Sequence, residues 1–271
     1  MRTGLAQMNT VWENVQKNKE RAERFFQRAA EQQVDLLVFP EMTLTGFSMQ
    51  VEKTAASWQE QVGFFEEMSR KYAVAAAFGY AMPVAERDRD AHPDWKPYHN
   101  HLAVAENGRI RMNYIKIHPF TYGQEGESFQ GGEQIVCMNW KDTVLGAFIC
   151  YDLRFPEIFQ ISSRKSELIL VIANWPKSRI DQWEALLRAR AIENQCFIVG
   201  VNRTGEGGGI AYNGHSAVYN PAGERLTELS GEEKLLLCDM DMGEVRRSRE
   251  RFPLKNDRRP ELYRQISLLS V

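Results

Sequence analysis

The chain has 271 residues, of which 43% are hydrophobic and 26% are charged, and its formal net charge at pH 7 is −2. This composition is that of an ordinary globular protein and excludes a disordered chain or a fibrous repeat. The nearly balanced charge gives no general attraction to nucleic acid or to an anionic membrane, so the expected partner is a small molecule. Because no proline-, glycine- or serine-rich linker divides the sequence, we expect one domain over residues 1–271.

The N-terminal residues lack the long apolar core of a signal peptide, and no later segment approaches the roughly 18 apolar residues of a membrane span. We therefore expect a cytoplasmic protein. The four cysteines, Cys137, Cys150, Cys196 and Cys238, show no CxxC spacing. Because three of them lie inside apolar runs typical of strands, we expect four reduced thiols, with neither a disulfide nor a metal site.

Helical and extended patterns alternate in the first half of the chain. Helical periodicity predicts helices over residues 12–33 and 55–71. Apolar runs predict strands over residues 3–8, 35–40, 73–82, 99–106 and 109–115. The sequence Glu106-Asn107-Gly108-Arg109 predicts a hairpin between the last two strands. The polar stretch 86–97 is typical of an exposed loop, and residues 117–132 form a long irregular segment of the kind that is usually functional.

The second half of the chain is richer in strands. We expect strands over residues 134–140, 143–149, 168–173, 196–201, 214–220, 224–230 and 234–240, and helices over 156–165, 179–195 and 242–251. Helices that alternate with so many strands indicate an α/β fold in which helices pack outside two facing sheets, in an αββα arrangement rather than a closed barrel. The glycine cluster 205–209 lacks the Lys-Ser/Thr of a phosphate loop, so we interpret it as a flexible turn.

Three polar residues come directly after predicted buried strands. Glu41 follows the strand 35–40, Lys116 follows 109–115, and Cys150 follows 143–149. If those strands share one sandwich, the three side chains can converge at one sheet end. A carboxylate can take the proton of a thiol, and an ammonium can stabilise both a thiolate and a tetrahedral oxyanion. Each residue alone has a structural explanation, but their joint placement favours catalysis by a cysteine nucleophile.

The sequence resembles the nitrilase, or carbon–nitrogen hydrolase, superfamily over almost its whole length. Three motifs in the family's order carry the resemblance: Leu37-Val38-Phe39-Pro40-Glu41, Tyr114-Ile115-Lys116-Ile117-His118 and Ile149-Cys150-Tyr151-Asp152-Leu153-Arg154-Phe155-Pro156-Glu157. The resemblance implies a four-layer αββα sandwich, with Glu41 as general base, Lys116 as oxyanion stabiliser and Cys150 as nucleophile. It places a second family glutamate on Glu125, with Glu127 as the alternative. It also implies that no metal or organic cofactor takes part, and that the chain forms a homodimer or a larger homo-oligomer.

Further motifs resemble those of the ω-amidase branch of this superfamily. They are Thr45-Gly46-Phe47, Cys150 to Pro156, Ala173-Asn174-Trp175-Pro176 and Arg188 to Asn194. Members of that branch hydrolyse the terminal amide of 2-oxoglutaramate or 2-oxosuccinamate and release ammonia. The resemblance implies the same reaction here, through a thioester on the cysteine.

Four residues near the motifs are candidates for substrate binding. Arg154 follows the nucleophile by four residues and could hold a substrate carboxylate in a bidentate fork; the alternative is an arginine paired with a nearby Asp or Glu. Trp175 and Phe120 are candidates for an apolar wall, although each could equally belong to the core. Tyr151 could contribute its side chain, and its backbone N–H is a candidate oxyanion donor.

Several alternatives remain open at this point. An N-carbamoyl amino acid amidase, another aliphatic amidase or a nitrilase proper would carry the same three residues, and a catalytically silent binding protein is a possibility of a different class. His99 and His101 would face the same side of one strand, but no third ligand lies nearby in the sequence, so strand packing is the better interpretation. His118 is a candidate for the entrance of the pocket.

Overall fold

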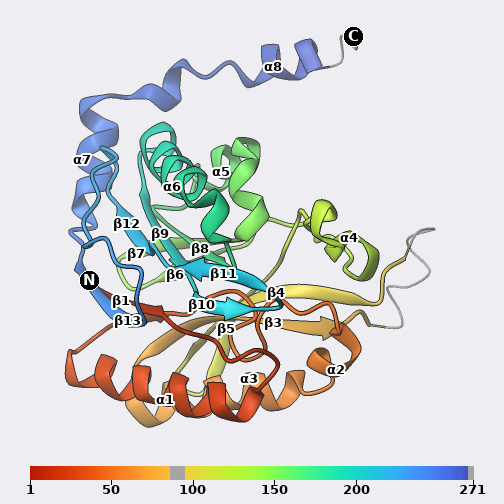
Figure 1. The fold of residues 1–271 in the computed structure, drawn as a ribbon. Coiled ribbons are helices and arrows are strands. Elements are labelled where there is room, and N and C mark those ends of the chain that lie inside the picture. Colours follow the sequence, from red (N-terminus) through yellow and green to blue (C-terminus); the bar gives the residue numbers. More distant parts are fainter. Residues whose placement is uncertain (86–94, 268–271) are drawn as a thin grey trace.

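The computed structural model describes residues 1–85 and 95–267. Two sheets face each other, and helices cover the outer face of each sheet (Figure 1). The first sheet has the order β13-β1-β2-β3-β4-β5. Its strands are β1 (Arg2–Gln7), β2 (Leu36–Val38), β3 (Ala75–Pro83), β4 (Tyr98–Glu106), β5 (Arg109–Ile115) and β13 (Lys234–Asp239). The helices on its outer face are α1 (Val15–Glu31), α2 (Val51–Ala55) and α3 (Trp58–Tyr72).

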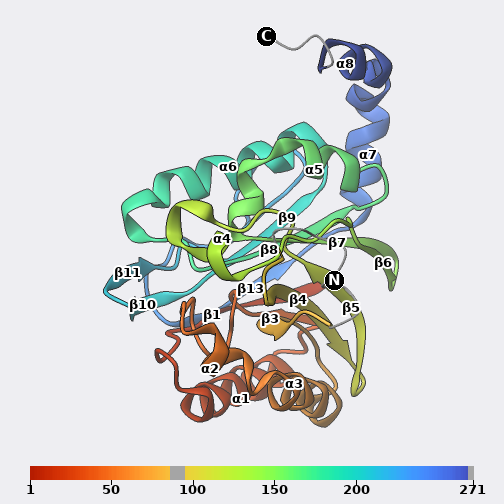
Figure 2. The same cartoon turned by 90° about the vertical axis from the view of Figure 1, so that its right-hand side faces the viewer.

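The second sheet has the order β12-β9-β8-β7-β6. Its strands are β6 (Cys137–Trp140), β7 (Thr143–Ile149), β8 (Leu168–Ala173), β9 (Phe197–Asn202) and β12 (Ala217–Tyr219). Helices α5 (Pro156–Ser162) and α6 (Ile180–Asn194) cover it, so that helix, sheet, sheet and helix form successive layers (Figure 2). The four-layer αββα sandwich is therefore confirmed.

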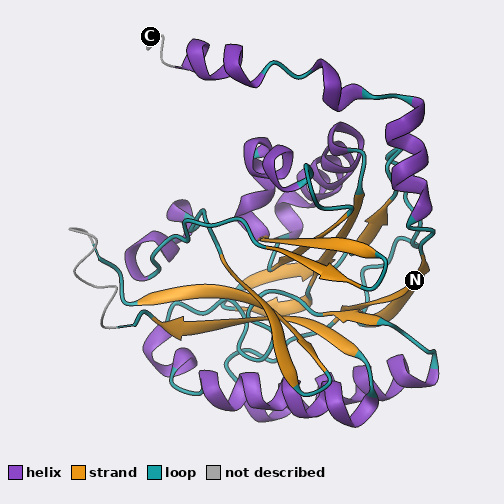
Figure 3. Cartoon of the chain, turned by 180° about the vertical axis from the view of Figure 1, so that it is seen from behind, coloured by secondary structure: helices purple, strands orange, loops and turns teal. Residues whose placement is uncertain are grey.

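Shorter elements connect these layers. A separate hairpin is formed by β10 (Thr204–Gly207) and β11 (Ile210–Asn213), and the segment after β5 contains the 3-10 helix η2 (Thr121–Gly123) and α4 (Glu125–Ser128). The 3-10 helices η3 (Cys150–Arg154) and η4 (Lys177–Arg179) follow β7 and β8. Helix α7 (Gly243–Arg251), η5 (Leu254–Asp257) and α8 (Pro260–Ser267) carry the chain beyond the sandwich (Figure 3).

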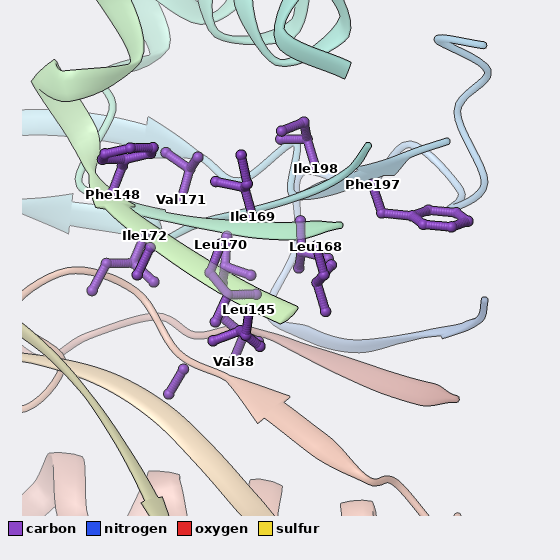
Figure 4. Close-up of a cluster of buried hydrophobic side chains, with 14 of the residues drawn as sticks. Val38, Leu145, Phe148, Leu168, Ile169, Leu170, Val171, Ile172, Phe197 and Ile198 are labelled. Atoms are coloured by element: carbon purple, nitrogen blue, oxygen red, sulfur yellow. The ribbon is translucent and has the colours of Figure 1, made fainter. Parts of the chain in front are cut away.

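The core between the sheets explains why the central strands are apolar throughout. Along β8, Leu168, Leu170 and Ile172 point toward the first sheet, whereas Ile169 and Val171 point toward the covering helices (Figure 4). All five side chains are fully buried. A strand covered on both faces needs apolar residues at every position rather than at alternate ones. The unbroken apolar run in the sequence is the direct result of this position.

The strand directions bring distant polar residues to one edge. Strands β1, β2 and β3 are parallel, and β4 runs antiparallel to both β3 and β5, so β2 and β5 point the same way. In the other sheet β7, β8 and β9 are parallel. The segments after β2, β5, β7 and β8 carry the candidate residues, as is usual for sites at the carboxyl ends of strands.

Several predicted boundaries differ from the observed ones for identifiable reasons. Helix α1 begins at Val15 rather than at residue 12, because the side chain of Asn14 accepts a hydrogen bond from the Lys17 N–H and caps the helix. The predicted helix 55–71 corresponds to α3, the short helix α2 before it was not predicted, and strands β6 and β12 are shorter than expected. Helix α8 was not predicted at all. Most of the expected loop 86–97 lies outside the described residues.

The predicted strand over residues 224–230 is wrong. The Asn220 side chain organises the turn before it, and the Val218 N–H, which would continue the pairing, donates to the Thr227 hydroxyl at 3.2 Å instead of to a backbone carbonyl. An isolated bridge between Arg225 and Tyr219 and a hydrogen bond from the Leu226 N–H to the Val218 carbonyl oxygen at 2.8 Å remain of the expected pairing. Within the described residues no helix is long and apolar enough to cross a membrane.

A stacked aromatic pair joins α3 to the first sheet and gives a test of the packing. Phe65 and Phe78 are fully buried, with ring centroids 4.0 Å apart and planes 9° from parallel. Phe65→Ala leaves a cavity against β3, and we expect it to lower the free energy of unfolding by about 3–5 kcal/mol in urea denaturation. The control is Phe252→Ala, whose side chain is 62% exposed and should change stability by less than about 0.5 kcal/mol. Equal effects of the two substitutions would contradict this packing.

Candidate active site

Cys150 lies at the first position after β7 and has an unusual backbone conformation. Its φ is +45°, in the left-handed region that non-glycine residues rarely adopt, and its side chain is partly buried. This conformation turns the chain sharply from the strand into η3 and presents the thiol at the end of the sheet. Such a backbone costs about 1–3 kcal/mol and persists only where the surrounding structure holds it. All four cysteines are free thiols.

Lys116 lies between two buried carboxylates. Its Nζ is 2.9 Å from Glu41 Oε1, and 2.8 Å and 3.1 Å from the two oxygens of Glu125. The side chains of all three residues are 1% exposed or less. The structure thus brings together Glu41, Lys116 and Glu125, which the sequence places on three different segments. Glu127, the alternative to Glu125, is exposed to solvent.

Two asparagines that were not proposed for the site hold Glu41 in place. Asn100 Nδ2 donates to Glu41 Oε1 at 2.8 Å and to Glu125 Oε1 at 2.9 Å. The backbone N–H of Asn174 donates to Glu41 Oε2 at 2.9 Å, and its side chain donates to the Glu41 carbonyl oxygen at 2.7 Å. With Lys116, these donors fix both carboxylate oxygens of Glu41. The signal for Asn100 was present in the sequence, as a polar residue inside a buried strand.

A glycine allows the segment carrying Glu41 to approach β3. A Cβ on Gly79 would lie 2.6 Å from the backbone nitrogen of Met42 and 2.9 Å from the Cα of Glu41. A Cβ atom does not approach non-bonded backbone atoms this closely, so any side chain at position 79 would displace Glu41. The Gly79 N–H also donates to Thr43 Oγ1 at 3.0 Å, which fixes the turn after Glu41.

The charges in this cluster shift one another's ionisation. Burial alone would lower the pKa of Lys116, but Glu125 and Glu41 outweigh it and raise the pKa above its ordinary value. Burial raises the pKa of Glu125, against the opposing effect of Lys116. Burial and then the charge of Glu41 raise the pKa of Cys150 well above its usual value, despite the nearby Lys116. At neutral pH the cluster therefore holds an ammonium next to a neutral thiol, which needs a base before it can attack.

Asp152 connects the turn of Cys150 to the segment of Lys116. Its fully buried carboxylate accepts hydrogen bonds from the Ile149 N–H at 3.1 Å and the Tyr114 hydroxyl at 2.8 Å. It also accepts from the His118 N–H at 3.0 Å and contacts His118 Nδ1 at 2.8 Å. His118 stacks on Phe155 at 3.7 Å and is not among the pocket residues, so its predicted place at the entrance is wrong.

A second clamp acts on the same turn from helix α6. The buried guanidinium of Arg190 donates to the Leu153 carbonyl oxygen from Nε at 3.1 Å and from Nη2 at 2.7 Å. Leu153 lies within η3, so this contact fixes the later part of the turn. Asp152 fixes its start, because it accepts from the Ile149 N–H. The two clamps together provide the support that the left-handed conformation of Cys150 requires.

Cys150 and Glu41 open into a pocket of about 310 Å³. The four predicted substrate-binding residues, Tyr151, Arg154, Trp175 and Phe120, all line it. Lining residues that the sequence reasoning missed are Trp12, Phe47, Met49, Gly123, Gln124, Asn174, Pro176, Arg179, Gly208, Ile210 and Tyr212. Six of the seventeen lining residues are aromatic and a few are polar or charged, a combination typical of small-molecule sites.

The glycine cluster 205–209 forms part of this wall rather than a flexible turn alone. Its first residues belong to β10, and Gly208 and Gly209 turn the chain into β11 with φ of +58° and +76°. Gly208, Ile210 and Tyr212 face the pocket.

The described residues contain no group of His, Cys, Asp or Glu side chains that could hold a metal ion. His101 Nδ1 contacts Asn113 Oδ1 at 2.9 Å, and its ring packs on Tyr80 and on His99. His99 Nδ1 contacts the Gln130 carbonyl oxygen at 2.9 Å. Both histidines pack within the sheet, as predicted.

Comparison with known proteins agrees with this geometry. The family model described as carbon-nitrogen hydrolase matches residues 2–250. The chain belongs to the carbon–nitrogen hydrolase family. Its match covers the segments that carry Glu41, Lys116, Glu125 and Cys150.

This carbon–nitrogen hydrolase is similar to several named bacterial proteins. It is 30% identical to the "Hydrolase in agr operon" of Staphylococcus aureus, over 97% of this chain and 100% of that protein. It is 30% identical to Omega-amidase YafV of Escherichia coli (strain K12), over 82% and 84% of the two chains. It is 29% identical to 2-oxoglutaramate amidase of Bacillus subtilis (strain 168), over 91% and 93%.

Solved structures share the same fold. XC1258 from Xanthomonas campestris, a CN-hydrolase superfamily protein with an arsenic adduct in its active site, superimposes with a TM-score of 0.86 at 29% identity, over 96% and 97% of the two chains. A mutant amidase from Nesterenkonia sp. AN1, with acrylamide added at its active-site cysteine, gives a TM-score of 0.83 at 28% identity, over 98% and 99%. The protein described here is a hydrolase that acts on amides.

Asp152 holds the turn of Cys150 against the segment of Lys116, so its loss should lower activity by displacing these residues. Asp152→Asn removes the charge that four contacts share, and hydrogen bonds to a charged group contribute about 1.5–3 kcal/mol. We expect kcat/KM for amide hydrolysis to fall about tenfold to hundredfold, with a folded protein by circular dichroism. The control is Asp142→Asn, because Asp142 is an exposed carboxylate on the turn before β7, the strand that leads to Cys150. A folded Asp152→Asn protein with full activity would exclude this role.

Proposed function

We propose that this protein hydrolyses the terminal amide of a small linear amide that carries a carboxylate, most specifically 2-oxoglutaramate or 2-oxosuccinamate. The observation that supports it best is that the cationic side chain of Arg154 lines the same pocket as Cys150 and Glu41. The similarity to Omega-amidase YafV and to 2-oxoglutaramate amidase favours the same class of substrate.

In the proposed acylation, Glu41 takes the proton from the Cys150 thiol as the sulfur attacks the amide carbon. Because the pKa of Cys150 is raised by burial and by Glu41, the proton leaves during the attack rather than before it. Negative charge then develops on the amide oxygen, and the Lys116 ammonium and the backbone N–H of Tyr151 are the proposed donors to it. The C–N bond breaks as protonated Glu41 gives its proton to the departing ammonia, which leaves a thioester on Cys150.

Deacylation repeats these steps with water. Glu41 takes a proton from a water molecule that attacks the thioester carbonyl, and as the C–S bond breaks it returns this proton to the sulfur, which releases the acid and restores the thiol. In this scheme Glu125 acts on Lys116, since its two oxygens hold the ammonium at 2.8 Å and 3.1 Å. It also accepts from the Phe120 N–H at 2.5 Å, which ties the pocket wall to the charged cluster.

Arg154 is the proposed contact for the substrate carboxylate. Its guanidinium lies 4.8 Å from the centre of the Trp175 ring and donates to the amide oxygen of Gln182 at 2.6 Å. Of the two possibilities that the sequence left open, the pairing of Arg154 with an Asp or Glu is not observed among the described residues. A cation held by a neutral amide keeps its charge available for a ligand.

Release of ammonia tests this proposal directly. We expect the highest kcat/KM with 2-oxoglutaramate, a lower value with glutaramate, and little release from an N-carbamoyl amino acid. Cys150→Ala should abolish turnover, because among the described residues that line the pocket no other cysteine can form the thioester. Cys137→Ala is the matched control, since that cysteine is also partly buried but lies at the start of β6, away from the pocket. Preference for the N-carbamoyl compound, or activity that survives Cys150→Ala, would contradict the proposal.

A further inference from the structure

The pocket carries a second cation, Arg179, on the wall next to Arg154. The Arg179 guanidinium lies 5.6 Å from the centre of the Phe120 ring, as that of Arg154 lies over Trp175. The Trp175 indole N–H donates to the Arg179 carbonyl oxygen at 2.8 Å. Two guanidinium groups therefore rest on two aromatic side chains of one connected wall, where cation–π contact orients them.

The two arginines differ in how many donors they keep. One nitrogen of Arg154 is engaged by Gln182. In the described part of the chain, the half-buried Arg179 side chain donates no hydrogen bond and pairs with no carboxylate. A guanidinium has five N–H donors and stays charged at any ordinary pH. Arg179 therefore offers a ligand more available N–H donors than Arg154 does.

The charge balance of the pocket favours an anion near these arginines. Among its described lining residues Glu41 is the one carboxylate, and it is already paired with Lys116. Arg154 and Arg179 thus add two positive charges that no lining carboxylate neutralises. A partly desolvated cation without a counterion gains most from an anionic ligand that supplies hydrogen-bond acceptors.

We propose that Arg179 is a specificity-determining residue that, together with Arg154, selects a 2-oxo acid over a simple carboxylic acid. This inference rests on the proposed function, because it concerns the far end of the same substrate. A 2-oxo acid presents three neighbouring acceptor oxygens, two on the carboxylate and one on the carbonyl. One guanidinium fork satisfies two oxygens in parallel, so the third needs a second donor group. Arg179 supplies that group.

The test compares two amides that differ only at the 2-oxo position. For the wild-type protein, Arg179→Gln and Arg179→Lys, kcat/KM is measured with 2-oxoglutaramate and with glutaramate. We expect Arg179→Gln to lower the ratio of the two values at least about tenfold, the loss expected for hydrogen bonds to a charged group. Arg179→Lys keeps the charge without the fork and should give an intermediate ratio. Lys177→Gln, which removes an exposed cation from the same turn η4, should leave the ratio unchanged.

Binding separates this inference from the proposed reaction. Calorimetry with the Cys150→Ala protein measures the affinity for each amide without turnover, and Cys150→Ala/Arg179→Gln should lose the preference for 2-oxoglutaramate. That loss supports the role of Arg179 even if the wild-type protein releases ammonia from neither amide, in which case the proposed function fails. An unchanged preference in Arg179→Gln, or an equal loss of affinity for both amides, overturns the inference.

Discussion

The buried ion pairs of Lys116 with Glu41 and Glu125 are the interaction on which the site depends. Three charged groups that are almost fully excluded from solvent would be strongly unfavourable in isolation. They are tolerated because the Lys116 ammonium pairs with both carboxylates and because Asn100 and Asn174 supply further hydrogen bonds. Removal of one partner from such a cluster typically costs about 3–5 kcal/mol, since it leaves a buried charge unpaired.

The same cluster explains why the fold needs two facing sheets. Glu41, Lys116 and Asn100 come from the first sheet, whereas Asn174 and Cys150 follow strands of the second. A single sheet could not place the thiol of Cys150 opposite a carboxylate and an ammonium, which both come from the facing sheet. Asp152 ties the two together, because it accepts from Tyr114 of β5 and from Ile149 of β7. The chemistry is thus placed where rigid strands end, and loops supply mainly the aromatic walls.

Much of this arrangement could be predicted from the sequence, because apolar runs and the polar residues that follow them are local features. Glu41, Lys116 and Cys150 were found at strand ends in this way, and Glu125 through the resemblance to the family. Asn100 is visible in the sequence as a polar residue in a buried strand, but its partner could not be found locally, since it lies 59 positions away. Arg179 is near the motif of Trp175 in the sequence, but only the fold shows that its side chain reaches Phe120. Similarly, the strand expected at 224–230 does not form because the Val218 N–H donates to the Thr227 side chain rather than to the opposite backbone.

The most direct test of the account is the mass of the enzyme during turnover. Enzyme quenched in acid while it hydrolyses its amide should carry the acyl group on the peptide that contains Cys150, and hydroxylamine added in place of part of the water should yield the hydroxamate. Both follow from a thioester at a cysteine that Glu41 activates. Continued ammonia release with an unmodified Cys150 and no hydroxamate would show that water attacks the amide directly, and would contradict the central claim.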